Sequence, residues 1–288
     1  MMARYRIPDP LALELSDLAE FVADHYCPQS HVKPEVIARE NGISVSYNDY
    51  GDDFDGMLEH RSGKFHIYVN TERNKVSTRQ RFTLCHELAH FYIDSHRIAL
   101  QSGQTPVHKS QSEFQSDNPV EIEADFFACS LLLPEKRFRK RAKSKAPGLP
   151  VVLDAAEQFK ASVSASAIRY VSLGIHEAIL VKWNKDDQYH WRRIGQSPWE
   201  KGYRNTIKAV HSLPKDSATT RAMNGEQPDS GAQFHTSTTM ANVWFPTISA
   251  SSLSANIILN EHAMRLGKYG TITVLTPYEH GFHQLIAR

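Results

Sequence analysis

Three residues in the first third of the chain have the types and spacing of a catalytic metal site. His86, Glu87 and His90 form an H-E-x-x-H pattern within the run FTLCHELAHF. Residues four apart in an α-helix lie about 40° apart around the axis, so both imidazoles can offer a nitrogen to one tetrahedral ion. Glu87 is rotated about 100° from His86 and borders the site without being a ligand. The pattern predicts a carboxylate base that acts on water at a metal ion.

A capped helix is predicted to carry this pattern. Ser77 and Gln80 form a capping box, and the helix that they open is predicted to run to about residue 94. A second helix is predicted to start at Asn118, a favourable cap, and to cover residues 119–133. Between the two helices, residues 96–117 are polar and rich in Gln and Ser, which predicts a loop.

A zinc site of this kind needs a third protein ligand, and His96 is one candidate. It stands six residues after His90, which is the spacing of the metzincin pattern H-E-x-x-H-x-x-G-x-x-H. The glycine of that pattern is replaced by Ile93, a β-branched residue that disfavours the positive φ of the turn. We therefore expect His96 to be an exposed histidine just after the helix end.

The favoured third ligand is Glu121. It lies four residues before Asp125 on one helical face, and Ala124 and Ala128 share that stripe. Small residues there, and Ala89 between the two histidines, allow the two helices to approach closely. Close approach is required because a carboxylate must come within about 2.0–2.2 Å of zinc. Asp125 can then accept a hydrogen bond from the free nitrogen of a ligand histidine.

Two other interpretations of these carboxylates stay open. Glu121 lies three residues after Asn118, so it can instead complete a capping box. Glu123 is the alternative ligand if the helix has a different register, and is otherwise expected to be a solvated surface carboxylate.

Several segments together resemble a known family. Asp55-Gly56 precedes a predicted strand, residues 79–90 read RQRFTLCHELAH, and residues 121–134 read EIEADFFACSLLLP. Residues 156–164, which read AEQFKASVS, continue the resemblance. The combination resembles the ImmA/IrrE-type H-E-x-x-H metallopeptidases.

This resemblance extends over roughly residues 11–173 and implies a gluzincin-like site. In such a site His86, His90 and Glu121 hold Zn2+, or another divalent metal such as Mn2+, and Glu87 is the catalytic base. The resemblance also implies that the substrates are folded regulatory proteins, notably helix-turn-helix repressors.

The strand before the metal helix is predicted to line the substrate cleft. Strands are predicted at residues 43–47, 57–60 and 65–70. In zincins a peptide adds as a strand to an exposed sheet edge beside the metal helix. Because residues 65–70 lie nearest to that helix in sequence, we expect them to form the edge strand; an interior strand is the alternative.

The whole chain is predicted to have an α+β fold in three regions. Residues 1–133 form a zincin-like (gluzincin-type) metallopeptidase domain, and residues 174–288 form a C-terminal α+β domain of unknown role. Residues 134–173 form a basic linker and a helical segment that resembles a helix-turn-helix. Such a basic run is more often a solvated surface than a nucleic-acid site.

Composition argues against several classes of protein. The 33 basic and 32 acidic side chains nearly balance, which makes direct nucleic-acid binding unexpected. No apolar run approaches the roughly 18 residues of a membrane span. The acidic residues among the first 26 argue against a signal peptide, and the three cysteines show no paired spacing. A cytoplasmic protein without a membrane partner is predicted.

The sequence therefore predicts a zinc-dependent metalloendopeptidase that cleaves a regulatory protein such as a helix-turn-helix repressor. The alternative is a regulatory protein without catalytic activity, which binds a repressor or DNA on a peptidase-like fold.

Overall fold

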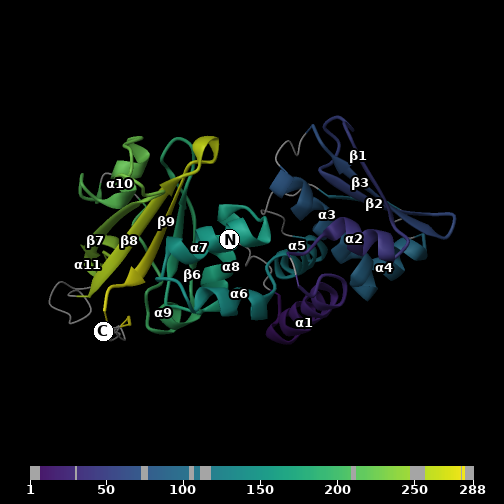
Figure 1. The fold of residues 1–288 in the computed structure, drawn as a ribbon, viewed down its shortest axis with the longest axis horizontal. Coiled ribbons are helices and arrows are strands. Elements are labelled where there is room, and N and C mark those ends of the chain that lie inside the picture. The colour runs from purple at the N-terminus through teal and green to yellow at the C-terminus, as the bar shows by residue number, and fades with distance from the viewer. Residues whose placement is uncertain are drawn as a thin grey trace. The chain divides into compact units, whose positions relative to one another are not determined.

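The protein, described here by a computed structural model, forms two compact units (Figure 1). The structure describes residues 7–29, 31–72, 77–103, 107–110, 118–208, 212–246, 257–279 and 281–282. The first unit contains Met1–Phe138 and Ala155–Ser162, and the second contains Arg139–Asp154 and Val163–Arg288. Among the described helices, none combines the length and the apolar character needed to cross a membrane.

The first unit is built on a four-stranded sheet with the order β1-β3-β2-β4. Its strands are β1 (Ser44–Asn48), β2 (Gly56–Arg61), β3 (Lys64–Asn70) and β4 (Val107–Ser110). β1 pairs with β3 in parallel, whereas β2 pairs antiparallel with both β3 and β4. The side chains of Leu58, Ile67 and Val69 are fully buried on one face of the sheet. This mixed sheet with its helices confirms the predicted α+β class for this part of the chain.

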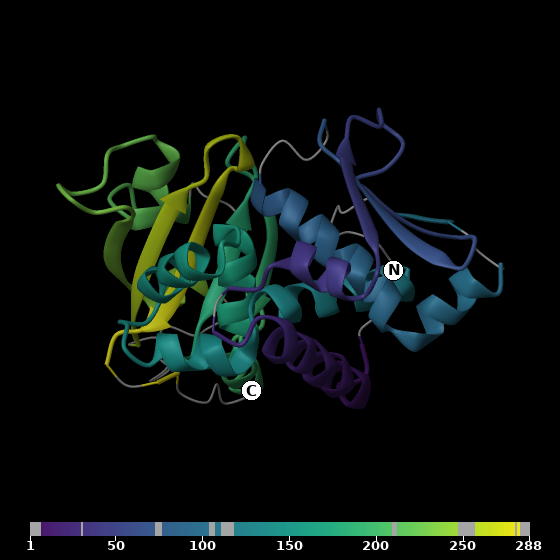
Figure 2. The ribbon, with the colours of Figure 1, turned by 45° about the vertical axis from the view of Figure 1, so that its right-hand side comes forward.

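The helices of this unit lie on one side of the sheet (Figures 1 and 2). They are α1 (Asp9–Tyr26), α2 (Pro34–Glu40), α3 (Ser77–Tyr92), α4 (Asp94–Gln101) and α5 (Pro119–Leu132). α3 packs against strands β2 and β3 on one side and against α5 on the other. As a result, all nine residues from Phe82 to His90 are buried. A helix that is buried all round is a central core element, and here its buried stretch includes four polar residues, Thr83, His86, Glu87 and His90.

Two predictions for this unit are wrong, one of an edge strand and one of a loop. Residues 65–70 belong to β3, which is paired on both sides and is therefore interior. Residues 96–117, predicted to be a polar loop, contain most of helix α4 and the strand β4 at one end of the sheet. β4 has four residues and pairs with β2, about fifty positions earlier in the chain. A strand this short has too little periodicity to be found without knowing its partner.

The second unit is built on a five-stranded sheet with the order β6-β5-β9-β8-β7, antiparallel in each of these pairs. Its strands are β5 (Ile179–Trp183), β6 (Tyr189–Ile194), β7 (His235–Met240), β8 (Ile258–Arg265) and β9 (Thr271–Pro277). Its shorter elements are α9 (Gln196–Glu200), α10 (Ala218–Met223), α11 (Ala241–Trp244) and the 3-10 turn η3 (Gly267–Tyr269). Strand-like runs in the sequence predict strands at residues 178–183, 189–194, 257–259 and 271–275, which correspond to β5, β6, β8 and β9, whereas β7 was not predicted.

Both faces of this second sheet are covered. Successive residues of a strand point to opposite faces. Glu261 accepts a hydrogen bond from the backbone N–H of Thr219 in α10, at 2.8 Å. The next residue, His262, accepts one from the backbone N–H of Leu149, at 3.2 Å. α10 and the start of α7 (Leu149–Phe159) therefore lie on opposite faces.

The segment predicted to resemble a helix-turn-helix consists of α7 and α8 (Val163–Leu173). Six of the eleven residues of α8 are buried, which leaves little of its surface free to enter a DNA groove. The structure does not confirm the helix-turn-helix interpretation.

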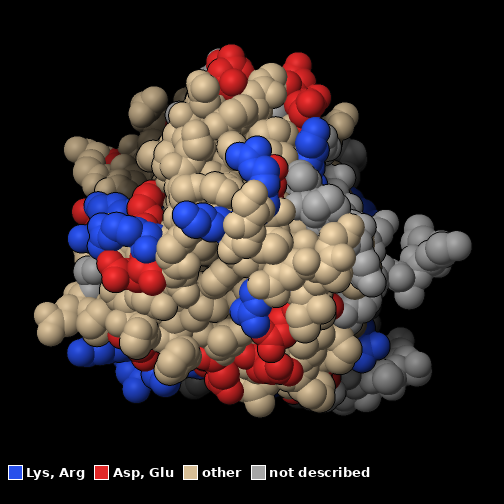
Figure 3. All heavy atoms as spheres, turned by 90° about the vertical axis from the view of Figure 1, so that its right-hand side faces the viewer, with Lys and Arg blue, Asp and Glu red and all other residues tan. Residues whose placement is uncertain are grey.

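The basic run after α5 forms α6 (Glu135–Ala142), and its arginines are engaged within the protein. Arg137 binds the carboxylate of Asp24, Arg141 binds that of Asp154, and Arg139 donates to a backbone carbonyl at the end of α8. On the face shown in Figure 3, basic and acidic side chains are interspersed among uncharged residues. These contacts favour a structural role for the run.

We predict that acidification destabilises the second unit through His262. Its Nδ1 accepts a hydrogen bond, so the fold requires an unprotonated nitrogen, and burial lowers the pKa of this imidazole. A histidine whose folded pKa is depressed contributes stability that is complete above its unfolded pKa of about 6.5 and is lost as the pH falls through the folded pKa.

Thermal unfolding between about pH 8 and pH 5 should show a smaller loss of Tm in His262→Gln than in the wild type. The pKa of His176 is also lowered by burial, so the Tm of the variant should still fall somewhat as the pH decreases. An equal loss of Tm in the two proteins over this pH range would show that His262 does not cause the acid destabilisation.

Candidate metal centre

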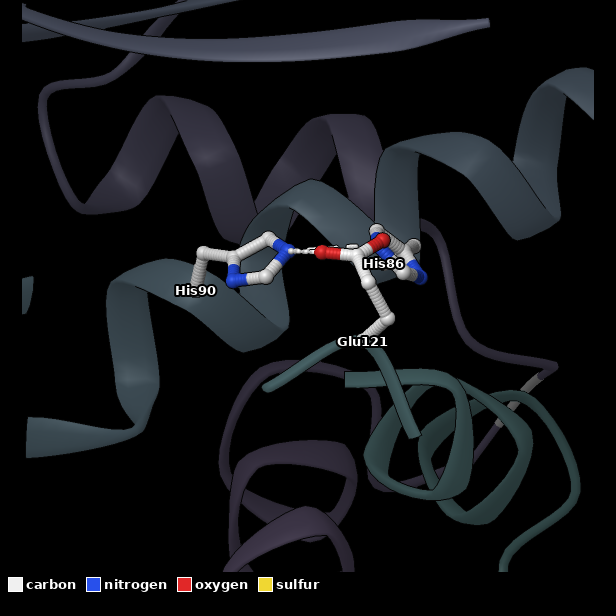
Figure 4. A group of neighbouring side chains, drawn as sticks. All are labelled: His86, His90 and Glu121. Atoms are coloured by element: carbon white, nitrogen blue, oxygen red, sulfur yellow. Dashed lines mark hydrogen bonds and ion pairs between the residues drawn. The ribbon is translucent and has the colours of Figure 1, made fainter. Parts of the chain in front are cut away.

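The three residues predicted as metal ligands lie together. His86 and His90 project from α3, and Glu121 projects from the first turn of α5. One ligand atom from each residue lies within 4.8 Å of the other two. In Figure 4 the Glu121 carboxylate faces the two imidazole rings. Both histidines are 1% exposed, and Glu121 is half-buried.

The separations of the donor atoms fit one tetrahedral ion. The two Nε2 atoms lie 3.1 Å apart. One carboxylate oxygen of Glu121, Oε2, lies 3.3 Å from His86 Nε2, and the other, Oε1, lies 3.7 Å from His90 Nε2. Bonds of about 2.0–2.2 Å to a tetrahedral zinc ion place its ligand atoms about 3.3–3.6 Å from one another. The observed distances bracket this range, so these side chains fit a divalent metal ion of this size.

The electrostatic environment of the site favours a cation. Burial lowers the pKa of His86, but hydrogen bonds with Asp125 and Glu121 and the charge of Glu87 outweigh this effect and raise the pKa to about 10. The surrounding carboxylates therefore stabilise positive charge at the imidazole. A divalent ion between His86 and Glu121 would supply that charge.

The free nitrogen of His86 is held by α5. Its Nδ1 lies 2.8 Å from a carboxylate oxygen of Asp125, the contact that the four-residue spacing from Glu121 predicts. Ala89 of α3 and Ala124 of α5 are fully buried, in keeping with the close approach that was predicted for these helices. A carboxylate on Nδ1 fixes the tautomer in which Nε2 carries the lone pair that a metal requires.

The predictions for His96 and Glu123 are wrong. His96 was expected to be an exposed histidine after the helix end, but it is buried within α4. Its Nδ1 lies 3.1 Å from His90 Nδ1, and its Nε2 lies 3.3 Å from a carboxylate oxygen of Glu123. Glu123 is therefore not a solvated surface carboxylate. The fold of α4 against α3, which brings these side chains together, could not be predicted from local spacing.

Glu121 is available to the site because another residue caps its helix. The side chain of Asn118 accepts a hydrogen bond from the backbone N–H of Val120. The carboxylate of Glu121 instead points to His86 and His90 (Figure 4). The geometry favours the metal-ligand interpretation over the capping box.

Glu87, the predicted base, is fully buried beside the candidate metal ligands. The hydroxyl of Ser110, at the end of β4, is hydrogen-bonded to its carboxylate. Gly56, at the start of β2, lies against the same carboxylate, where a Cβ would overlap Glu87 Oε1 and approach Thr83 Cγ2 at 2.5 Å. Sequence reasoning noticed Asp55-Gly56 only as part of a family resemblance and missed Ser110.

Asp55 ties the sheet to the helix that carries the site. Its carboxylate forms an ion pair with Arg79 of α3, at 3.1 Å. Its backbone N–H donates to the carbonyl of Ser110, and its own carbonyl accepts from Asn70. These contacts hold the start of β2, the end of β4 and α3 in one arrangement around Glu87.

Other polar residues near the motif are engaged elsewhere. Burial raises the pKa of the Cys85 thiol, which makes it a poor metal ligand. Tyr68, His66 and Tyr92 are residue types that can stabilise an oxyanion in sites of this kind, and each of them has another partner in the structure. The Tyr92 hydroxyl accepts from Asn41, the Tyr68 hydroxyl donates to Glu59, and His66 contacts Ser44.

Comparisons with known proteins find one matching family and a similar fold. Residues 38–170 match the family Peptidase M78, described as the IrrE N-terminal-like domain. Among solved structures, the fold is similar to that of a Mycobacterium tuberculosis transcriptional regulator. The two chains share 13% sequence identity, and the superposition has a TM-score of 0.55. The match covers 96% of this chain and 94% of that chain. At this identity the likeness shows the fold alone. No curated protein sequence matches the chain.

We predict that His86→Ala, His90→Ala and Glu121→Ala each abolish stoichiometric zinc binding, because each change removes one of the three donors. Elemental analysis after gel filtration measures the bound metal. Glu14→Ala, which removes an exposed carboxylate from α1, is the matched control and should retain the wild-type amount. Full zinc content in Glu121→Ala together with loss in His96→Ala would show that His96, and not Glu121, is the third ligand.

Proposed function

We propose that this chain, which belongs to the IrrE N-terminal-like family of peptidases through residues 38–170, is a metal-dependent endopeptidase with a gluzincin-type, zincin-like site. One observation carries the proposal. The donor atoms of His86, His90 and Glu121 have the mutual separations of a tetrahedral ligand set, and Glu87 adjoins them on the same helix.

Each residue has a role in this proposal. His86, His90 and Glu121 would hold zinc, or another divalent metal such as Mn2+. When bound, such an ion supplies Lewis-acid chemistry, which polarises the scissile carbonyl and makes water more acidic. Glu87 accepts a proton from the attacking water at a carboxylate oxygen and delivers it to the leaving amine. Ser110 and Gly56 confine that carboxylate to one position.

The substrate strand is assigned to β4 in place of β3. Among the described strands, β4 is the one that ends the sheet next to β2, and Ser110 joins it to Glu87. A peptide that pairs with the edge of β4 to which no described strand pairs would be held through its backbone, which tolerates many side chains. The scissile bond would then lie next to the base.

The proposed substrate is a folded regulatory protein, such as a helix-turn-helix repressor, that is encountered in the cytoplasm. The family resemblance supports this class. Incubating zinc-loaded protein with a purified candidate repressor, and mapping products by mass spectrometry, tests the proposal. Binding of the repressor without any cleavage would instead support a regulatory protein without catalytic activity.

We predict that Glu87→Gln keeps its zinc and loses hydrolysis. The amide preserves the size of the side chain but cannot accept the proton, and general acid–base catalysis contributes about 10²–10⁴-fold to such rates. Cleavage of a fluorogenic peptide or a repressor measures the loss. Glu14→Gln makes the same charge change on an exposed surface and should have wild-type activity. Near-normal cleavage by Glu87→Gln would rule out Glu87 as the base.

We also predict that Gly56→Ala impairs cleavage without removing metal. The added methyl group would overlap Glu87 Oε1 and press on Thr83, so the carboxylate must move, while the three metal ligands are untouched. Zinc content should equal that of the wild type, and kcat should fall more than KM changes. An unchanged kcat would mean that the position of Glu87 does not depend on Gly56.

A further inference from the structure

A second layer of side chains lies behind His90. Its Nδ1, on the side of the ring away from Glu121, faces Nδ1 of His96 at 3.1 Å. The other nitrogen of His96 faces a carboxylate oxygen of Glu123 at 3.3 Å. His96 is 7% exposed, and the side chain of Glu123 is 14% exposed. The order Glu123–His96–His90 therefore forms a shielded chain that ends at a predicted metal ligand.

The carboxylate at the end of this chain assigns the protons along it. An ionised carboxylate accepts hydrogen bonds and cannot donate one, so His96 must carry a proton on Nε2. A neutral His96 then has a lone pair on Nδ1, which can accept from an N–H on Nδ1 of His90. His90 in turn has its lone pair on Nε2, the nitrogen that faces Glu121 and His86. Glu123 thus sets the tautomer that metal binding at His90 requires.

The junction between two helices makes this contact geometrically feasible. α3 ends at Tyr92 and α4 begins at Asp94, with Ile93 between them in an extended conformation (φ −77°, ψ 112°). The chain therefore turns sharply without the positive φ that a glycine would supply. The turn returns His96 to the far side of His90, so its ring meets Nδ1 of His90.

We propose that His96 and Glu123 are positioning residues that orient His90 and raise the affinity of the site for its metal ion. This inference rests on the proposed metal centre and adds two residues to it. His86 receives the same support directly from Asp125, whereas His90 receives it through an intervening imidazole. Helix α5 thereby supplies the proposed ligand Glu121. It also supplies Asp125, which orients His86, and Glu123, which orients His90 through His96.

The test measures the apparent zinc affinity of the purified full chain by competition with a chromophoric chelator. His96→Phe keeps a ring in place but removes both nitrogens, and Glu123→Gln removes the negative charge. Outer-layer partners of ligand histidines typically contribute about 10–100-fold to metal affinity, so each variant should bind zinc more weakly by about that factor. His96→Asn restores a polar atom near the position of Nδ1 and should recover part of the loss.

Two further measurements separate positioning from a general effect on the fold. If His96 and Glu123 act as one chain, the double variant should bind zinc no more weakly than His96→Phe alone, because the second change removes nothing further. Thermal unfolding in the presence of chelator should be similar in the wild type and Glu123→Gln. His25→Phe, at an exposed histidine of α1, is the matched control and should bind zinc with wild-type affinity.

The outcomes distinguish this inference from the proposed function. A wild-type chain that binds no zinc would overturn the metal centre and the inference together. A wild-type chain that binds zinc, with variants that match it within about twofold, would overturn the positioning role and leave the metal centre intact. Additive losses in the double variant would also overturn the role, because they would show that the residues act separately. Glu123 is more exposed than His96, so its substitution perturbs the fold less. If His96→Phe does not fold, the zinc affinity of Glu123→Gln alone tests the positioning role.

Discussion

The burial of polar side chains inside a central helix constrains the whole first unit. From Phe82 to His90, each residue of α3 is buried, including two imidazoles and a carboxylate. Burying such groups without partners costs several kcal/mol, and a charge costs far more. The neighbouring elements must therefore present polar groups at defined positions. Asp125 meets His86, His96 meets His90, and Ser110 meets Glu87.

Helix α5 satisfies most of this requirement. Its small residues Ala124 and Ala128 are fully buried, and the same helix presents three carboxylates in its first two turns. One of them lies in the cluster of candidate ligands, and the other two contact imidazoles. Because a single rigid helix carries all three, a shift of α5 would disturb every contact at once. Such coupling through shared partners is what makes a site of this kind geometrically precise.

The second unit has a buried polar network of its own but none of the proposed catalytic residues. Glu261 is fully buried and accepts hydrogen bonds from the Thr219 backbone and from the Trp244 indole. Around it, the sheet buries a large aromatic core that includes Trp183 and Tyr203. All the residues of the candidate metal centre belong to the first unit.

Much of the site was predictable from sequence because its central relations are local. The four-residue spacing of His86 and His90, and that of Glu121 and Asp125, is read directly from helical geometry. Capping residues predicted the helices α3 and α5 to within about two residues of their observed ends. These relations are between residues that are close in sequence, so they can be predicted without knowledge of the tertiary structure.

The tertiary structure decided the relations between distant segments. β3 was predicted as an edge strand and is interior, because its neighbours β1 and β2 are set by pairing that no local pattern records. His96 was considered only as a metal ligand, which would have required a glycine turn at position 93. The bend at Ile93 instead brings His96 to the far side of His90. Ser110 had no signal at all, since its contact with Glu87 depends on strand β4 pairing with β2. Helical spacing fixes which side chains share a face, but packing of the whole unit decides what that face meets.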